Sequence, residues 1–129
     1  MSNLEQDVSL SNVFWWNPSA GIDWLDFHGA LDDITNLESE IQQPIAIVAH
    51  PKADLPRGNA IPHLNRLFTI LKKSSTIQCF IIVLDGRHPI SKMLMNVILR
   101  VYGIPKNFIV VQTVEQALEE IRTNLTSAN

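Results

Sequence analysis

The chain has 129 residues, 46% of them hydrophobic, and a formal net charge of −3 at pH 7. This length fits one domain whose core needs neither disulfide bonds nor a structural metal. A membrane span is excluded because no run approaches roughly 18 consecutive apolar residues, and the polar, acidic N-terminus is not typical of a signal peptide; we expect a soluble, cytoplasmic protein.

The first third of the chain predicts a hairpin followed by a helix. Val8–Trp16 reads as a strand, residues 17–21 (NPSAG) as a turn, and Ile22–Phe27 as a second, roughly alternating strand. Asp32 or Asp33 can cap the helix that follows. Its apolar positions at helical spacing are Ile34, Leu37 and Ile41.

Three apolar runs in the rest of the chain predict buried strands: Pro44–His50, Ile77–Leu84 and Asn107–Val111. Strands that are apolar on both faces and separated by helices indicate a parallel sheet covered by helices. The expected helices are Asn59–Leu71, Ile90–Val101 and Thr113–Leu125. Helical spacing predicts an inward face on the first of them, made of Ile61, Leu64, Leu67, Phe68 and Leu71, and one on the last, made of Val114, Ala117, Leu118, Ile121 and Leu125. The last helix opens with a capping-box pattern at residues 113–116 (TVEQ). The prediction is a single α/β domain of order ββαβαβαβα, a mixed sheet with a parallel centre flanked by helices, and loose tails at 1–7 and 126–129.

This element order resembles the STAS domain, found in anti-sigma-factor antagonists and sulfate-transporter tails. Residues 27–32 (FHGALD) resemble that family's exit from its second strand, and 85–125 are similar to the C-terminal half of bacterial STAS-like proteins of unassigned role. The resemblance implies a STAS-like fold and a regulatory, non-enzymatic module acting through protein contacts. The family's phosphorylated serine lies in an Asp-Ser-Ser-Gly motif. The corresponding residues here, 54–60 (DLPRGNA), contain no Ser or Thr, so the usual phospho-switch is not expected.

Two polar loops after buried strands supply the candidate binding residues. A helix N-terminus attracts anions through its unpaired N–H groups and dipole, and ligands of open α/β sheets sit beyond the carboxyl ends of strands. The loop around the start of the second helix contributes Lys52, Asp54, Arg57, Gly58, Asn59 and His63. The next loop contributes Asp85, Arg87, His88 and Ser91. We expect these residues to form the working surface of a protein-binding module or, alternatively, of a small-anion receptor or an enzyme in which Asp85 and His88 transfer protons. The simpler alternative for the first loop is an ordinary solvated loop in which Asp54 and Arg57 pair locally.

Three tryptophans, Trp15, Trp16 and Trp24, fall in the expected hairpin. Adjacent strand residues face opposite sides of a sheet, so at most one of the first two lies in the core. Because tryptophan is enriched at interface hot spots, the hairpin is a candidate interface for a partner or a homodimer. The alternative is that the outer tryptophan is partly covered by the chain's own N-terminus. A third hypothesis for the function is a structural or oligomerising domain whose hairpin tryptophans bind another chain.

Other chemistry finds little support in the sequence. The four histidines lack metal-ligand spacing, and the lone Cys79 lies in an apolar strand where a buried, inert thiol is expected, so we predict no metal site and no cofactor. Residues 1–51 contain eight acidic and no basic residues, whereas 52–106 contain nine basic residues. This asymmetry indicates either packing of the two halves against each other or a basic face. Nucleic-acid binding is not expected, because the basic residues are scattered and not interleaved with aromatics.

Overall fold

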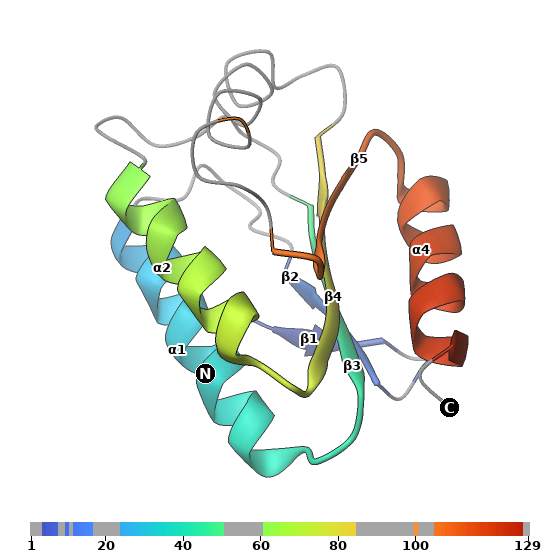
Figure 1. The fold of residues 1–129 in the computed structure, drawn as a ribbon, viewed down its shortest axis with the longest axis horizontal. Coiled ribbons are helices and arrows are strands. Elements are labelled where there is room, and N and C mark those ends of the chain that lie inside the picture. The colour runs from blue at the N-terminus through green and yellow to red at the C-terminus, as the bar shows by residue number, and fades with distance from the viewer. Residues whose placement is uncertain are drawn as a thin grey trace.

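The chain folds around a five-stranded sheet with helices on both faces (Figure 1). This computed structural model describes residues 4–7, 10, 12–16, 24–50, 61–84, 100 and 105–127. The strands are β1 (Glu5–Gln6), β2 (Val13–Trp16), β3 (Ile45–Ala49), β4 (Ile77–Val83) and β5 (Phe108–Val111). They lie in the order β1-β2-β3-β4-β5, with β1 antiparallel to β2 and the other pairs parallel. The predicted α/β class and mixed sheet with a parallel centre are confirmed.

Two helices pack on one face of the sheet and a third packs on the other (Figure 1). Helices α1 (Trp24–Glu40) and α2 (Ile61–Lys73) share the first face, and α4 (Val114–Ser127) covers the second. None of these helices is both long enough and apolar enough to cross a bilayer. The helix expected over 90–101 lies outside the described residues, Arg100 apart.

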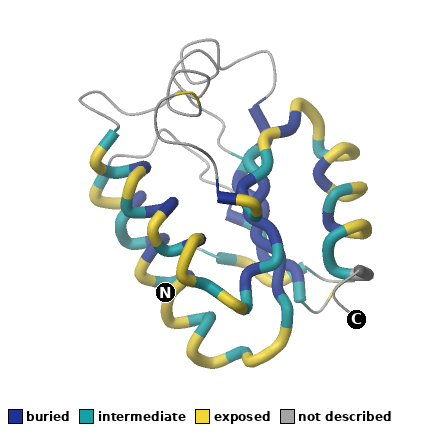
Figure 2. The backbone as a smooth tube through the Cα atoms, in the orientation of Figure 1, coloured by how far each residue is buried: buried dark blue, intermediate teal, exposed yellow. Residues whose placement is uncertain are grey.

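Both faces of the central strands are buried, as Figure 2 shows for the middle of the sheet. All five residues of β3 are buried. Ile45, Ile47 and Ala49 contribute to the core beneath α1 and α2, whereas Ala46 and Val48 contribute to the core beneath α4. This is why Pro44–His50 and Ile77–Leu84 read as continuous apolar runs, and their adjacent, parallel placement confirms the prediction made from them.

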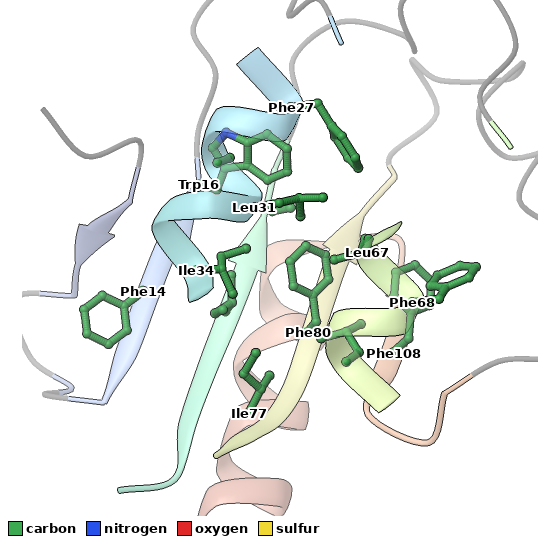
Figure 3. Packing of buried hydrophobic residues seen from close by; sticks show 14 of the residues in the cluster. Phe14, Trp16, Phe27, Leu31, Ile34, Leu67, Phe68, Ile77, Phe80 and Phe108 are labelled. Atoms are coloured by element: carbon green, nitrogen blue, oxygen red, sulfur yellow. The ribbon is translucent and has the colours of Figure 1, made fainter. Parts of the chain in front are cut away.

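The larger core lies between the sheet and the α1–α2 layer (Figure 3). Phe80 on β4 is 1% exposed, and its ring lies parallel to that of Phe108 on β5, with centroids 6.0 Å apart. Phe68 from α2 meets Phe108 edge-on at 5.0 Å. Aromatic contacts of this kind join one helix and two strands, and they hold the middle of α2 against the sheet.

The hairpin predicted over Val8–Trp16 and Ile22–Phe27 is wrong. Residues 24–27 form the first turn of α1, and the antiparallel partner of β2 is β1, in a segment expected to be a loose tail. The apolar side chains that α1 buries recur at helical spacing: Phe27, Ala30, Leu31 and Ile34. Asp32 and Asp33 therefore lie inside the helix rather than at its cap. Glycine is unfavourable in a helix interior, and Gly29 therefore argued against a helix that begins before it.

The inward faces of α2 and α4 follow the predicted spacing with one exception. In α2 the buried residues are Leu64, Leu67, Phe68 and Leu71. In α4, Ala117 and Ile121 are buried, but Leu118, predicted to face inward, is 38% exposed. Half of the predicted capping box is confirmed, because the hydroxyl of Thr113 accepts the backbone N–H of Gln116 at 3.1 Å. The return bond differs: Gln116 Oε1 accepts the N–H of Gln112, one residue before the cap, at 2.8 Å.

Asn107 ties three elements together at the start of β5. Its side-chain Nδ2 donates to the backbone carbonyls of Leu71 at 3.0 Å and Ile77 at 3.2 Å, at the end of α2 and the start of β4. Removing one donor that serves two carbonyls leaves both without this partner. We expect Asn107→Ala to lower the free energy of unfolding by about 1–3 kcal/mol in urea titrations. The exposed Asn36→Ala on α1 is the control, and equal losses in the two variants would contradict this role.

Candidate functional site

The carboxyl ends of β2, β3 and β4 lie at one edge of the sheet, which is the edge where α1 and α2 begin (Figure 1). Trp16 is in register with Ala49, and Ala49 is in register with Ile82. The two predicted binding loops follow β3 and β4 directly, so the sheet brings their starting points together. Ligands of open α/β sheets bind at this edge, which makes it the first place to look for a site.

Among the predicted binding residues, His63 is the one that the structure describes. Nine others lie in the segments 51–60 and 85–99, outside the described residues: Lys52, Asp54, Arg57, Gly58, Asn59, Asp85, Arg87, His88 and Ser91. His63 is half-buried in the first turn of α2 and turns toward α1. The group it contacts there was not predicted from the sequence.

Helices α1 and α2 are joined near their first turns by a pair of histidines. Nε2 of His28 lies 2.7 Å from Nδ1 of His63, and both rings are partly buried. On the other side of the first ring, Nη1 of Arg66 donates to Nδ1 of His28 at 2.8 Å. Nη2 of Arg66 binds the Asp32 carboxylate at 2.5 Å. The four side chains form a continuous polar chain between the helices.

The guanidinium fixes the protons of both imidazoles. Arginine can only donate, so Nδ1 of His28 must carry a lone pair, and the proton of the neutral ring must sit on Nε2. That Nε2–H donates to Nδ1 of His63, which places the proton of neutral His63 on its own Nε2. Each histidine is thus held as the Nε2–H tautomer.

The environment of His28 disfavours its charged form. Partial burial lowers the pKa of His28 below its ordinary value of 6.5, and the charge of Arg66 and the neighbouring ring of His63 lower it further. The carboxylate of Asp32 acts in the opposite direction. Because Asp32 is paired with Arg66 rather than with an imidazole, it does not orient either ring as the carboxylate of a catalytic triad would.

An aromatic stack connects the histidine pair to Trp24, the first residue of α1. The ring of Trp24 lies parallel to that of His63, with centroids 4.2 Å apart and an interplanar angle of 10°. Phe27 meets Trp24 edge-on at 5.3 Å and packs against Trp16 of the core at 5.8 Å. The stack therefore connects the surface of the first turn to the sheet.

Beside this stack, Leu25 is 80% exposed, more than the other large hydrophobic side chains among the described residues. Its neighbours Trp24 and Phe27 are turned inward, so Leu25 projects from a turn that the aromatic contacts hold in place. We refer to six residues together as the head surface: Trp24, Leu25, His28, Asp32, His63 and Arg66. It combines a rigid aromatic base, one apolar projection and charged groups at its rim.

The head surface is not arranged for acid–base or metal chemistry. A general base needs an available lone pair, and in these tautomers the Nδ1 lone pairs of His28 and His63 already accept hydrogen bonds. A metal on Nε2 of His28 would leave a proton on Nδ1 that needs an acceptor, whereas Arg66 offers a donor. Among the described residues, no group of three or more His, Cys, Asp or Glu side chains is placed to hold a metal.

The candidate interface tryptophans occupy three different environments. Trp16 is 6% exposed and belongs to the core under α1 and α2, so it cannot serve as a contact residue. Trp15 points to the opposite face, as its neighbouring position requires, and its Nε1–H donates to the Asp7 carboxylate at 2.8 Å. Trp24, expected in a strand, is instead the first residue of α1.

The opposite edge of the sheet carries two open hollows, of about 580 and 320 Å³. The larger one lies near the starts of β4 and β5 and includes Ser74 and Asn107. Both side chains already serve the fold, because Ser74 accepts the N–H of Ile77 and Asn107 donates to two carbonyls. These two side chains of the larger hollow are therefore engaged in holding the fold together, and we take the head surface as the stronger candidate.

The charge asymmetry of the sequence appears at this site as an ion pair between the two halves of the chain. Asp32 comes from the acidic half and Arg66 from the basic half, and the pair joins α1 to α2. For these two residues, the contact supports the interpretation that the acidic first half of the chain packs against the basic second half.

Comparison of the chain with protein-family models, with curated proteins and with solved structures finds no match.

Proposed function

We propose that this chain is a non-enzymatic protein-binding module that docks its partner at the head surface. The observation that carries the proposal is Leu25, which is exposed at 80% on a turn fixed by the stack of Trp24 and His63. Interfaces combine a desolvated apolar anchor with a polar rim. Leu25 supplies the anchor, and the partly exposed pair of Arg66 and Asp32 supplies the rim.

The occupant we propose is a protein with an apolar pocket that receives Leu25. Burying a leucine side chain contributes about 1.5–3 kcal/mol, a substantial share of the roughly 8 kcal/mol of a micromolar complex. The occupied lone pairs of His28 and His63 favour binding over catalysis at the same surface.

We further propose that the module is STAS-like and regulatory. Two features of the fold support this: the antiparallel first pair, β1 with β2, and the parallel β-strands joined by helices after it. Without Ser or Thr in residues 54–60, regulation of the usual phosphorylated kind is not part of the proposal.

Photo-crosslinking from position 25 in cells that express the chain tests the proposal by identifying a partner. We expect one predominant crosslinked protein, whose affinity, measured with purified components, falls about ten- to hundredfold with Leu25→Asp. An acidic residue is favourable in the first turn of a helix, so this variant retains its fold. Leu118→Asp, at an exposed leucine on α4, is the matched control.

Two results would contradict the proposal: no crosslinked protein at position 25, or equal affinities of the two aspartate variants. Sedimentation equilibrium of the purified chain establishes whether the partner is a second copy. In that case, Leu25→Asp must lower the average mass toward that of the monomer and Leu118→Asp must not.

A further inference from the structure

The polar chain between α1 and α2 accommodates only neutral imidazoles. Arg66 donates to His28, and His28 donates to His63, so every facing pair of atoms has one proton between them. There is no position for another proton within this chain.

Each way of adding a proton breaks a hydrogen bond between the helices. If His28 becomes an imidazolium, its new Nδ1–H faces the N–H of Arg66. If His63 becomes an imidazolium, its new Nδ1–H faces the Nε2–H of His28. Moving the His28 proton to Nδ1 relieves the second conflict but creates the first. At least one of the two imidazole hydrogen bonds that join the helices is therefore lost whichever ring is protonated, while the contacts of Arg66 with the His28 carbonyl and with Asp32 involve no imidazole proton.

The charged groups around the pair come from both helices. Among the described residues, Arg66 and His63 of α2 and Asp32 of α1 act on His28. Asp32 favours a proton on His28 and already binds Arg66, whereas partial burial, Arg66 and His63 oppose that proton. The indole of Trp24 attracts a cation on its face, so His63 keeps its stack after protonation. The hydrogen bonds of His28 are the contacts that break.

We propose that His28, His63 and Arg66 form a pH-sensitive latch, which fixes the first turns of α1 and α2 together at neutral pH and opens in mild acid. The regulatory consequence rests on the proposed function: opening the latch loosens the turn that presents Leu25 and weakens docking at the head surface. Histidine is suited to this role because its ordinary pKa lies just below neutral pH.

Nuclear magnetic resonance of the imidazole nitrogens in the free chain tests the latch without a partner. At neutral pH we expect both His28 and His63 to carry their proton on Nε2 and to have an unprotonated Nδ1. As the pH falls below 6.5 we expect His28 to gain its second proton. This change should be accompanied by chemical-shift changes of the backbone amides of residues 24–28, 61 and 63–66, and by faster hydrogen exchange of those amides among them that are protected at neutral pH. A proton on Nδ1 of His28 at neutral pH would overturn the proposal, as would protonation with no change in these amides.

Replacing the guanidinium supplies a second, independent measurement. With Arg66→Met, His28 loses the donor that excludes its second proton, so its titration midpoint should move up toward 6.5. Arg122→Met is the matched control, because Arg122 lies on α4 in an exposed ion pair with Glu119. An unchanged midpoint in folded Arg66→Met would overturn the latch, and if that variant does not fold, the tautomers of the unmodified chain decide. None of these results depends on a partner, so failure of the docking experiment leaves the latch test intact.

Discussion

Phe80→Ala is expected to lower the free energy of unfolding by about 3–5 kcal/mol. The ring is 1% exposed in the middle of β4, beneath the helical layer of α1 and α2, and it stacks on Phe108. Truncation removes the transfer free energy of the ring and leaves a cavity that neighbouring strands cannot close. Because domains of this size are stable by only about 5–15 kcal/mol, the variant should lie near the limit of folding.

Urea titrations followed by circular dichroism measure this loss. Val110→Ala on the neighbouring strand is the control, since Val110 is 38% exposed and its truncation should cost less than about 1 kcal/mol. A loss below about 2 kcal/mol for Phe80→Ala would show that this ring is not packed at the centre of the core.

Raising the pH above 9 should destabilise the chain through its one cysteine. Burial, and secondarily the charge of Glu120, raises the pKa of the Cys79 thiol from 9.0 to about 12. Between these values the unfolded chain has released the thiol proton and the folded chain has not, so stability falls as pH rises. The loss attributable to Cys79 is about 1.4 kcal/mol for each pH unit above 9.0, or roughly 2 kcal/mol at about pH 10.5.

Comparison of the parent chain with Cys79→Ala isolates this contribution, because lysines and tyrosine also titrate in that range. We expect urea midpoints of the two proteins to converge between about pH 8 and about pH 10.5. Parallel pH profiles would contradict a buried, protonated thiol. The same burial accounts for the inert thiol predicted from the sequence, since a thiolate is the reactive species.

The difference between predicted and observed N-terminal structure has a local cause. Ile22–Phe27 alternates over too few residues to separate a strand from the first turn of a helix, and Gly29 obscured the face formed by Phe27, Ala30 and Leu31. β1 has only two residues, and both are exposed, so it has no apolar pattern that a sequence could reveal. It exists because its backbone pairs with β2.

The candidate site was missed for a related reason. His28 and Asp32 are four residues apart, and His63 and Arg66 are three apart, so each pair shares a helix face once both helices are known. The sequence analysis predicted a helix that begins at Asp32 or Asp33, so His28 lay outside any predicted helix. His28 and Asp32 therefore had no common helix face in that prediction. The spacing of the two histidines along the chain, 35 residues, carries no signal for a contact.

The sequence by itself determined the layered α/β architecture, because apolar runs such as Pro44–His50 can be buried on both faces only inside a parallel sheet covered by helices. It also determined the inward face of α2 and the cap of α4, which depend on residues within one or two turns. Only the tertiary structure decided that Leu25 would project into solvent and that two histidines distant in the sequence would be hydrogen-bonded to each other, with an arginine on the far side of the first ring. Those outcomes depend on how two helices cross above the sheet, and that geometry is set by the packing of the whole core.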